Sequence, residues 1–309
     1  MTALLSAASL NACKGIELEN RIEQIEGYTE PVVMIVAANE RNRYKNNYSS
    51  EIWDIRMEDD GEAFDEVMIQ NVKSFMQDLK TMCMLAEERG LDVSSQERDT
   101  IRKMSEEYYF GLSAADREYI GCSIEDVQSL YTDYFTANKL VEQLTASSNS
   151  EISDSEAKVI RLEQIVTEDL KKATAILKKV KIDGADFEAM ASRYTEDEVI
   201  ELTLERGKND SLYEKTAFSL ESGQISNILG IDGKYYLIKC VSDYDEEATA
   251  ERKEKLQTAM ENRSFETFYI PYKKEHKVVF SEKFWNDIDL KKGEDSSVEN
   301  FFDIYEKYI

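Results

Sequence analysis

Apolar residues in the first half of the chain recur mainly at the spacing of an α-helix. Between residues 62 and 86 they fall three or four positions apart, so they line one face of a long helix. Ser94 and Ser123 each precede an acidic side chain by three residues, which is the capping-box pattern of a helix N-terminus. The first half is therefore predicted to be mostly helical.

Two short stretches of this half are predicted to be extended. Residues 32–38 follow Pro31 and are rich in β-branched side chains, as a short strand would be. Residues 52–55 are predicted to form a second brief extended segment. Residues 15–30 are polar and lack apolar periodicity, so we expect a tether there, and residues 40–48 are predicted to form a short polar helix.

The pattern changes after residues 146–150, a run of small and polar residues of the kind that links domains. Strands and helices then alternate. The strands are predicted at residues 159–166, 200–204 and 235–241, and the helices at residues 168–180 and 186–194. This order is typical of a small α+β domain.

The last segment is predicted to hold a charged helix at residues 246–269 and a strand at residues 277–280. The aromatic pair Phe284 and Trp285 follows. We expect this segment to pack back on the N-terminal strand and helices, so that the two chain ends form one domain.

Composition limits the partners. The 309 residues are 42% hydrophobic, enough for more than one core, so we expect at least two domains. The formal net charge of -25 argues against nucleic acid, because phosphate backbones are bound by clustered Lys and Arg. The same charge repels anionic lipid headgroups, so membrane attachment would need something other than a basic patch.

Cysteine and histidine usage excludes several chemistries. The four cysteines are too scattered for a disulfide framework, and Cys83 and Cys240 are predicted to be core residues. The single histidine, His276, removes most histidine-based metal sites and acid–base schemes. No glycine-rich phosphate loop or nucleophile–base pair is present, so we expect neither a metal nor another cofactor.

The N-terminus carries a candidate export and anchoring signal. Residues 1–12 are small or apolar and uncharged, and they lead directly into Cys13. Residues 10–13, Leu-Asn-Ala-Cys, resemble the bacterial lipobox, in which the cysteine is acylated. The run is too short to span a bilayer, so a signal over residues 1–13 with a lipid anchor on Cys13 is the prediction. The alternative is an apolar N-terminus with a chance cysteine.

Three runs resemble a family of folding factors. Residues 217–226, Ala-Phe-Ser-Leu-Glu-Ser-Gly-Gln-Ile-Ser, are similar to the parvulin pattern A-x-F-x-L-x-x-G-E-I-S. Residues 184–195 are similar to a second parvulin run, and residues 85–97 to the N-domain signature of PrsA-type and SurA-type foldases. The resemblance implies an α+β chain in which both ends form a SurA-N-like helical chaperone domain. That domain would comprise residues 31–150 and 246–309, with a parvulin-like domain inserted at residues 155–243.

The resemblance also assigns a proline pocket, and this sequence departs from it. Gln164 and Tyr236 stand where parvulins carry their two histidines. Tyr213 and Phe218 match the aromatic pocket residues, whereas Asn209 replaces an apolar one. Gln164 and Tyr236 could hydrogen-bond to each other. The family's acidic or thiol group would come from one of three residues on the second strand: Glu201, Thr203 or Glu205.

Three functions follow as hypotheses. The leading one is a lipid-anchored chaperone on the outer face of a bacterial cell membrane that binds unfolded exported polypeptides; a homodimer formed through its helical domain is part of this hypothesis. In it, the parvulin-like domain is a degenerate, non-catalytic module. The first alternative is a weak peptidyl-prolyl isomerase, because rotation about an X–Pro bond needs an apolar pocket but no nucleophile. The second is a cell-envelope interaction scaffold.

Overall fold

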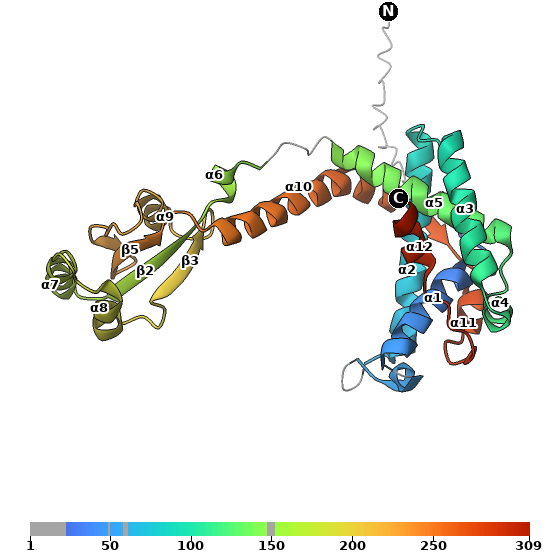
Figure 1. The fold of residues 1–309 in the computed structure, drawn as a ribbon, viewed down its shortest axis with the longest axis horizontal. Helices are drawn as coiled ribbons and strands as arrows, with labels where there is room; N and C mark the ends of the chain where they lie inside the picture. The colour runs from blue at the N-terminus through green and yellow to red at the C-terminus, as the bar shows by residue number, and fades with distance from the viewer. Residues whose placement is uncertain (1–22, 49, 58–60, 147–151) are drawn as a thin grey trace, which may run out of the picture. The chain divides into compact units, whose positions relative to one another are not determined.

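The computed structural model describes residues 23–48, 50–57, 61–146 and 152–309, so the lipidation candidate Cys13 lies outside the described residues. The chain forms two compact units, residues 1–144 with 266–309 and residues 145–265 (Figure 1). The first unit is thus built from both chain ends. As expected, the fold is α+β.

The first unit is mainly helical. Its helices are α1 (Glu30–Tyr48), the 3-10 helix η1 (Ser50–Asp54), α2 (Phe64–Glu88), α3 (Ser95–Gly111), α4 (Ala114–Ile120), α5 (Ile124–Thr145), α11 (Glu282–Asp287) and α12 (Phe301–Tyr308). The structure confirms the three helices predicted from periodicity and caps, α2, α3 and α5. Ser94 and Ser123 cap α3 and α5 as predicted, each accepting a backbone N–H from the acidic residue three positions on.

The prediction of a strand at residues 32–38 is wrong, because these residues belong to α1. All seven are buried, so α1 is surrounded by protein along this stretch. A helix that is apolar on every side shows no amphipathic period, and a short apolar run then looks like a buried strand. Residues 52–55 were also predicted as extended, but 50–54 form η1, whose Trp53 is buried against Phe64.

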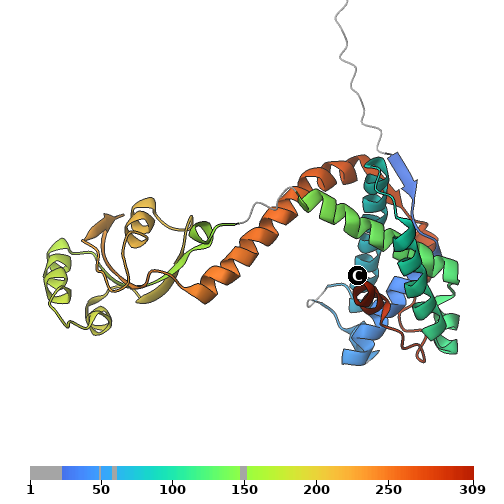
Figure 2. The ribbon, with the colours of Figure 1, turned by 45° about the horizontal axis from the view of Figure 1, so that its top comes forward.

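A two-stranded parallel sheet joins the chain ends. Strand β1 (Glu23–Glu26) pairs with β6 (His276–Val279), and Figure 2 shows the two side by side. Part of the expected tether is therefore a strand, and β6 pairs with it instead of with residues 32–38. The pairing continues at Gly27, whose N–H donates a hydrogen bond to the Val279 carbonyl oxygen, with 2.8 Å between nitrogen and oxygen. A Cβ on Gly27 would lie 2.3 Å from the Phe280 ring, so only glycine has room there.

Helix α10 (Glu246–Glu275) extends beyond its predicted end at residue 269 and contains Pro271. Proline removes one helical hydrogen bond and commonly ends a helix. Here the hydroxyls of Tyr269 and Tyr272, on either side of the proline, donate to carboxylates of α2. These contacts hold the turn around Pro271 in helical form.

A buried polar network ties α1 to the C-terminal residues. Asn39 is 1% exposed; its Nδ2 donates to the Tyr108 hydroxyl at 2.6 Å and its Oδ1 accepts the Phe301 N–H at 3.0 Å. Arg41 is also 1% exposed, and its Nε donates to the Leu290 carbonyl at 2.7 Å. These side chains satisfy backbone groups that would otherwise be buried without a partner.

Asp116 forms the second node of this network. Its Oδ1 accepts hydrogen bonds from the Ser296 hydroxyl and from the N–H groups of Ser297 and Val298, at 2.8 to 3.1 Å. Burial raises the pKa of this carboxyl, but hydrogen bonds from Ser113 and from these C-terminal groups outweigh burial and lower its pKa to about 2. The carboxylate therefore stays ionised while it holds the C-terminal loop.

The second unit is a four-stranded antiparallel sheet covered by helices. The strands run in the order β3 (Glu201–Glu205), β2 (Val159–Thr167), β5 (Lys234–Ser242) and β4 (Leu229–Ile231). The helices are α6 (Asp154–Ala157), α7 (Leu170–Val180), α8 (Phe187–Tyr194) and α9 (Ser211–Ala217). All five elements predicted between residues 159 and 241 are confirmed, whereas no bounds were predicted for α9 or for the three-residue β4.

Helices cover both faces of the sheet (Figure 1). On one face, α9 places Tyr213 and Ala217 against Ile160 and Leu162 of β2 and Ile238 of β5. On the other, α7 and α8 pack against alternate residues of the same strands. We call the first of these the α9 face.

Residues 246–265, which we expected to pack with the N-terminal domain, lie in the second unit. The hydroxyl of Thr249 accepts the Val159 N–H at 3.0 Å, and Arg252 donates to the carbonyls of Glu156 and Arg206. The start of α10 is thus bound to the start of β2 and to the turn that follows β3.

The Asn39 node predicts a large loss of stability on truncation. Asn39→Ala leaves the Tyr108 hydroxyl and the Phe301 N–H buried without their partner. Each such group costs about 1–3 kcal/mol, so we expect a loss of about 2–6 kcal/mol. Both tryptophans, Trp53 and Trp285, are buried in the first unit, so denaturant unfolding followed by tryptophan fluorescence reports that unit alone. The control is the exposed Asn47→Ala, which should change stability by less than about 0.5 kcal/mol. Equal effects of the two substitutions would refute the role of Asn39.

The Asp116 node predicts a pH dependence. Because its pKa is lowered on folding, its stabilisation is complete above the ordinary value of 3.8 and is lost as pH falls toward about 2. Asp116→Asn should therefore be less stable at neutral pH by about 2 kcal/mol or more, since charge-assisted hydrogen bonds are lost. The difference between the two proteins should shrink as pH falls from about 4 to about 2, measured by tryptophan fluorescence. Parallel curves would contradict this assignment.

Candidate functional site

Three of the predicted pocket residues meet on the α9 face. Gln164 pairs with Ile238 across β2 and β5, and Tyr236 pairs with Val166. Side chains alternate between the faces of a sheet, so Gln164 and Tyr236 are diagonal neighbours on the same face. Helix α9 places Tyr213 over them. The sequence could align these residues with the family, but the register and α9 bring them together.

Gln164 and Tyr213 form a buried hydrogen-bonded pair. The Tyr213 hydroxyl donates to Gln164 Oε1 at 2.8 Å, and Gln164 Nε2 donates to the Val199 carbonyl at 3.0 Å. Gln164 is 7% exposed and Tyr213 is 6% exposed. The expected partner of Gln164, Tyr236, is thus not the one observed. With its oxygen and its amide nitrogen both bonded inside the protein, Gln164 acts here as a structural residue.

The two tyrosines differ in environment. Burial, the neighbouring Tyr236 and the Asp197 carboxylate raise the pKa of Tyr213, so its hydroxyl is neutral at physiological pH and serves as a donor. Tyr236 is half-buried, and its ring meets that of Tyr213 edge-on, at 5.6 Å between centroids and 85° between planes. Gln164, Tyr213 and Tyr236 together offer no strong general base.

Phe218 lies at the end of α9, at the margin of the same apolar cluster. The Arg206 guanidinium lies 3.9 Å from the centroid of the Phe218 ring, which is a cation–π contact. Arg206 therefore covers a ring face that the family resemblance assigns to proline. The sequence carries no local signal for this role of Arg206, because nothing in it links a turn residue to a ring twelve positions away.

Asn209 does not join the buried part of this cluster. It is exposed, in the turn before α9, and its backbone N–H donates to the Glu214 carboxylate at 2.9 Å. Glu214 also accepts the N–H groups of Gly207 and Lys208, which fixes the turn and lowers the pKa of Glu214. The expected polar residue inside the apolar pocket is therefore not observed.

None of the three second-strand candidates lies on the α9 face. Leu202 and Leu204 of β3 pack into the cluster with Tyr213, so the alternating residues, Glu201, Thr203 and Glu205, point to the opposite face. The structure excludes all three from this pocket.

Three carboxylates gather on the opposite side of the sheet. Oxygens of Glu163, Glu188 and Glu201 lie within 4.8 Å of one another, the one such group found in the part of the chain that the structure describes. Glu163 is already paired with Lys239 at 3.0 Å. The buried Glu163 is thus one half of an ion pair, while Glu188 and Glu201 are exposed, and we assign the group no cofactor.

The sole histidine lies in the other unit. His276 begins β6, its ring stacks on Tyr272 at 3.9 Å, and its Nδ1 is 2.9 Å from the Tyr272 carbonyl oxygen. His276 therefore belongs to the first unit and is not a residue of the α9 face.

The first unit contains a groove between α1, α2, α5 and α12, with a volume of about 480 Å³. Its floor is formed by the buried side chains of Val36, Met68 and Val72. Half-buried aromatic rings form its walls. These are Tyr44, Phe64, Phe75, Tyr134 and Phe302. We refer to this site as the aromatic groove.

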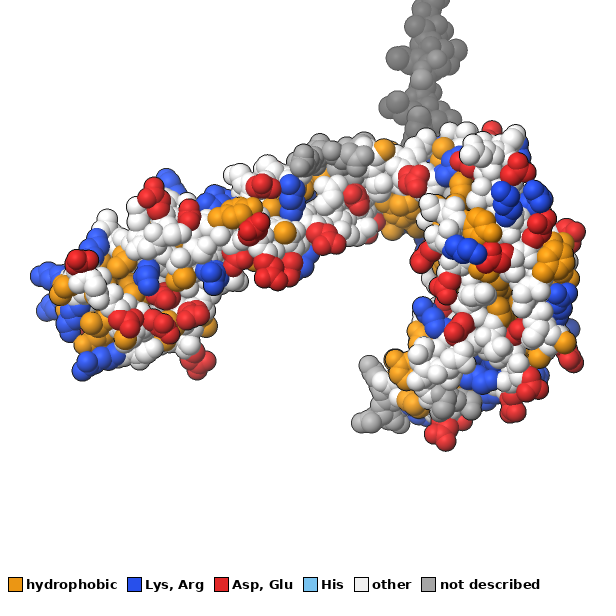
Figure 3. All heavy atoms as spheres, in the orientation of Figure 1, with side chains coloured by type: hydrophobic (Ala, Val, Ile, Leu, Met, Phe, Trp, Pro, Cys, Tyr) orange, Lys and Arg blue, Asp and Glu red, His pale blue; other side chains and the backbone are white. Residues whose placement is uncertain are grey.

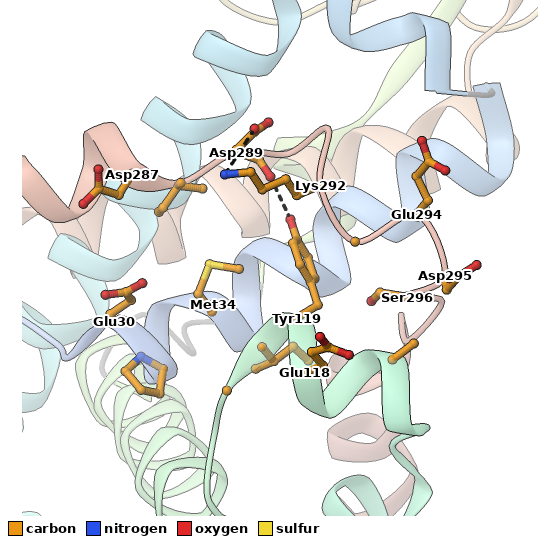
Figure 4. Close-up of a pocket in the computed structure, with 16 residues that line it drawn as sticks. Glu30, Met34, Glu118, Tyr119, Asp287, Asp289, Lys292, Glu294, Asp295 and Ser296 are labelled. Atoms are coloured by element: carbon orange, nitrogen blue, oxygen red, sulfur yellow. Dashed lines mark hydrogen bonds and ion pairs between the residues drawn. The ribbon is translucent and has the colours of Figure 1, made fainter.

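A wider hollow of about 730 Å³ lies between α1, α4 and the C-terminal loop of the same unit. Figure 4 shows Tyr119 at its centre, with its hydroxyl bonded to the Asp289 carbonyl oxygen at 3.3 Å. Carboxylates such as Glu30, Glu118 and Glu294 are spread around it and do not converge on one point. A metal ion requires converging ligands, so this acidic hollow is not a metal centre.

Comparison with known proteins identifies the second unit. Residues 139–244 match the PPIC-type PPIase domain family. No curated protein sequence matches the chain. Similar solved structures include PrsA from Bacillus cereus, at 19% identity, covering 84% of this chain and 99% of that one with a TM-score of 0.33.

PrsA from Bacillus subtilis is 19% identical, with 72% of this chain and 93% of that one covered and a TM-score of 0.28. A SurA-like chaperone from Campylobacter jejuni is 14% identical, with 72% of this chain and 90% of that one covered and a TM-score of 0.27. No helix among the described residues is both long and apolar enough to cross a bilayer. The matched residues contain the antiparallel sheet and its α9 face, so this part of the chain is similar to PPIC-type PPIase domains in sequence.

Proposed function

We propose that this protein is an extracytoplasmic folding factor that binds unfolded exported polypeptides, with a PPIC-type domain that no longer catalyses isomerisation. The observation that carries the proposal is the Gln164–Tyr213 pair on the α9 face. Here a domain similar to PPIC-type PPIases holds, at one histidine position of the family, a buried amide whose oxygen and nitrogen are both hydrogen-bonded within the protein. Such a domain can contact a chain without accelerating its isomerisation.

The physical argument concerns differential binding. Isomerisation of an X–Pro bond faces a barrier of roughly 20 kcal/mol, and catalysis needs a site that favours the twisted amide over the planar one. Here the buried polar groups of Gln164 and Tyr213 are already bonded to the protein, and Arg206 occupies one face of Phe218. Few groups are left to stabilise a twisted amide specifically.

The location is part of the same proposal. Residues 10–13 resemble a lipobox, and acylation of Cys13 would tether the two units to the outer face of a cytoplasmic membrane. The aromatic groove supports polypeptide binding, because half-buried rings around an apolar floor accept varied apolar side chains. Self-association of the helical unit remains part of the proposal.

A second candidate function is weak prolyl isomerase activity. Tyr236 favours it, since this ring is half-buried beside Tyr213 on the face where the family binds proline. The Tyr236 hydroxyl could donate to the carbonyl of a bound peptide.

Chaperone activity is tested by aggregation of an unfolded client. The full-length protein should slow light scattering of a chemically denatured, diluted client at about equimolar ratio, because bound segments are withdrawn from association. An equally acidic protein of similar size serves as the control for charge alone. A client that aggregates at the same rate with and without the protein would refute polypeptide binding.

Isomerase activity is tested by refolding of a client limited by proline isomerisation. We expect no acceleration by the wild-type protein, and the same result for Tyr236→Ala, because the pocket lacks free groups to favour the twisted amide. Acceleration by the wild type that Tyr236→Ala abolishes would establish the second candidate. An active parvulin in parallel confirms that the assay detects catalysis.

A further inference from the structure

We propose that the aromatic groove of the helical unit binds apolar client segments that are flanked by lysine or arginine, an inference that rests on the polypeptide binding proposed above. The groove belongs wholly to the first unit, between α1, α2, α5 and α12. Its volume of about 480 Å³ falls in the range of sites that hold a few side chains.

The walls of the groove are held in place by contacts among the rings. Tyr44 meets Phe64 at 5.1 Å between centroids, and Phe302 meets Tyr134 at 5.4 Å and Phe75 at 6.0 Å. Edge-to-face contacts of this kind fix ring orientation. A groove whose walls are already ordered loses little conformational entropy when a ligand enters, so its exposed ring surface is available for binding.

The rim of the groove is acidic. Asp303 and Glu306 lie one turn apart on α12 and are both exposed. Glu40 is the third acidic residue of the rim and is paired with Arg43. Within the described ranges the structure gives neither Asp303 nor Glu306 an ion-pair partner. The rim therefore carries two uncompensated negative charges directly beside an apolar site.

The negative charge of the rim determines which peptide segments the aromatic groove favours. A client segment with lysine or arginine beside its apolar residues would place positive charge next to Asp303 and Glu306, whereas an acidic segment would be repelled. A second copy of this chain is disfavoured in the groove, because each copy carries a net charge of -25. Figure 3 shows acidic and basic side chains interspersed with hydrophobic ones on the face it displays, so overall charge alone does not mark a docking position.

The test measures binding of short labelled peptides to the full-length protein by fluorescence anisotropy. The peptides share one core of leucine and phenylalanine and differ only in flanks of lysine or of glutamate; a third peptide has lysine flanks and a serine core. We expect the lysine-flanked apolar peptide to bind about tenfold more tightly than the glutamate-flanked one, with the difference shrinking at high salt. The serine-core peptide should bind weakly, because the groove walls are apolar.

Two double variants locate the effect. Asp303→Asn with Glu306→Gln removes the rim charges and should abolish most of the preference for lysine flanks. The matched control, Glu118→Gln with Glu294→Gln, removes the same charge from the exposed acidic hollow of Figure 4 and should leave the preference unchanged. All four residues are exposed, so both double variants should fold, which tryptophan fluorescence verifies.

The outcomes separate this inference from the proposed function. Equal loss of preference in both double variants would show that only net charge matters and would overturn the groove assignment. Slowed aggregation of a client without flank-dependent peptide binding would also overturn it, while polypeptide binding would stand. Failure of both the aggregation assay and the peptide assay would refute the two proposals together. A photoreactive phenylalanine in the lysine-flanked peptide should crosslink to α2 or α12.

Discussion

The fold of the helical unit depends on buried side chains of α1 and α4 that satisfy the backbone of the C-terminal segment. The loop before α12 has no regular secondary structure, so its N–H and C=O groups need partners from elsewhere. Arg41 and Asn42 supply donors to the Leu290 and Val298 carbonyls, and Asp116 accepts the N–H groups of the same loop. These bonds make the last residues part of the first core. The PPIC-type unit is therefore an insertion between two parts of one domain.

Buried polar groups need hydrogen-bond partners on the α9 face as well. Gln164 is buried where the family carries a histidine, and Tyr213 and the Val199 carbonyl satisfy its amide. This hydrogen-bonded pair stabilises the sheet and the position of α9. The cation–π contact between Arg206 and Phe218 acts in the same direction. The aromatic groove, in contrast, presents half-buried ring surface around an apolar floor.

Local signals explain which elements could be predicted. Helices α2, α3 and α5 have one polar and one apolar face, and the caps at Ser94 and Ser123 act within three residues, so their sequences are sufficient. Strands β2 and β5 were also predicted, because their apolar residues form short runs between turn signals. Helix α1 was not, since burial on every side removes the amphipathic pattern. Strand β1 was missed because its partner, β6, lies far away in the sequence.

For the candidate site, too, some features follow from the sequence and others from the tertiary structure. The sequence by itself determined the similarity of residues 139–244 to PPIC-type domains, the absence of histidine from that domain, and the identity of Gln164, Tyr213, Phe218 and Tyr236 as pocket candidates. Only the tertiary structure decided that Tyr213 is the hydrogen-bond partner of Gln164, that Asn209 is exposed, and that Arg206 covers Phe218. The reason is physical: residue types and local spacing are properties of the sequence, whereas burial and contacts between distant residues depend on strand register and helix packing.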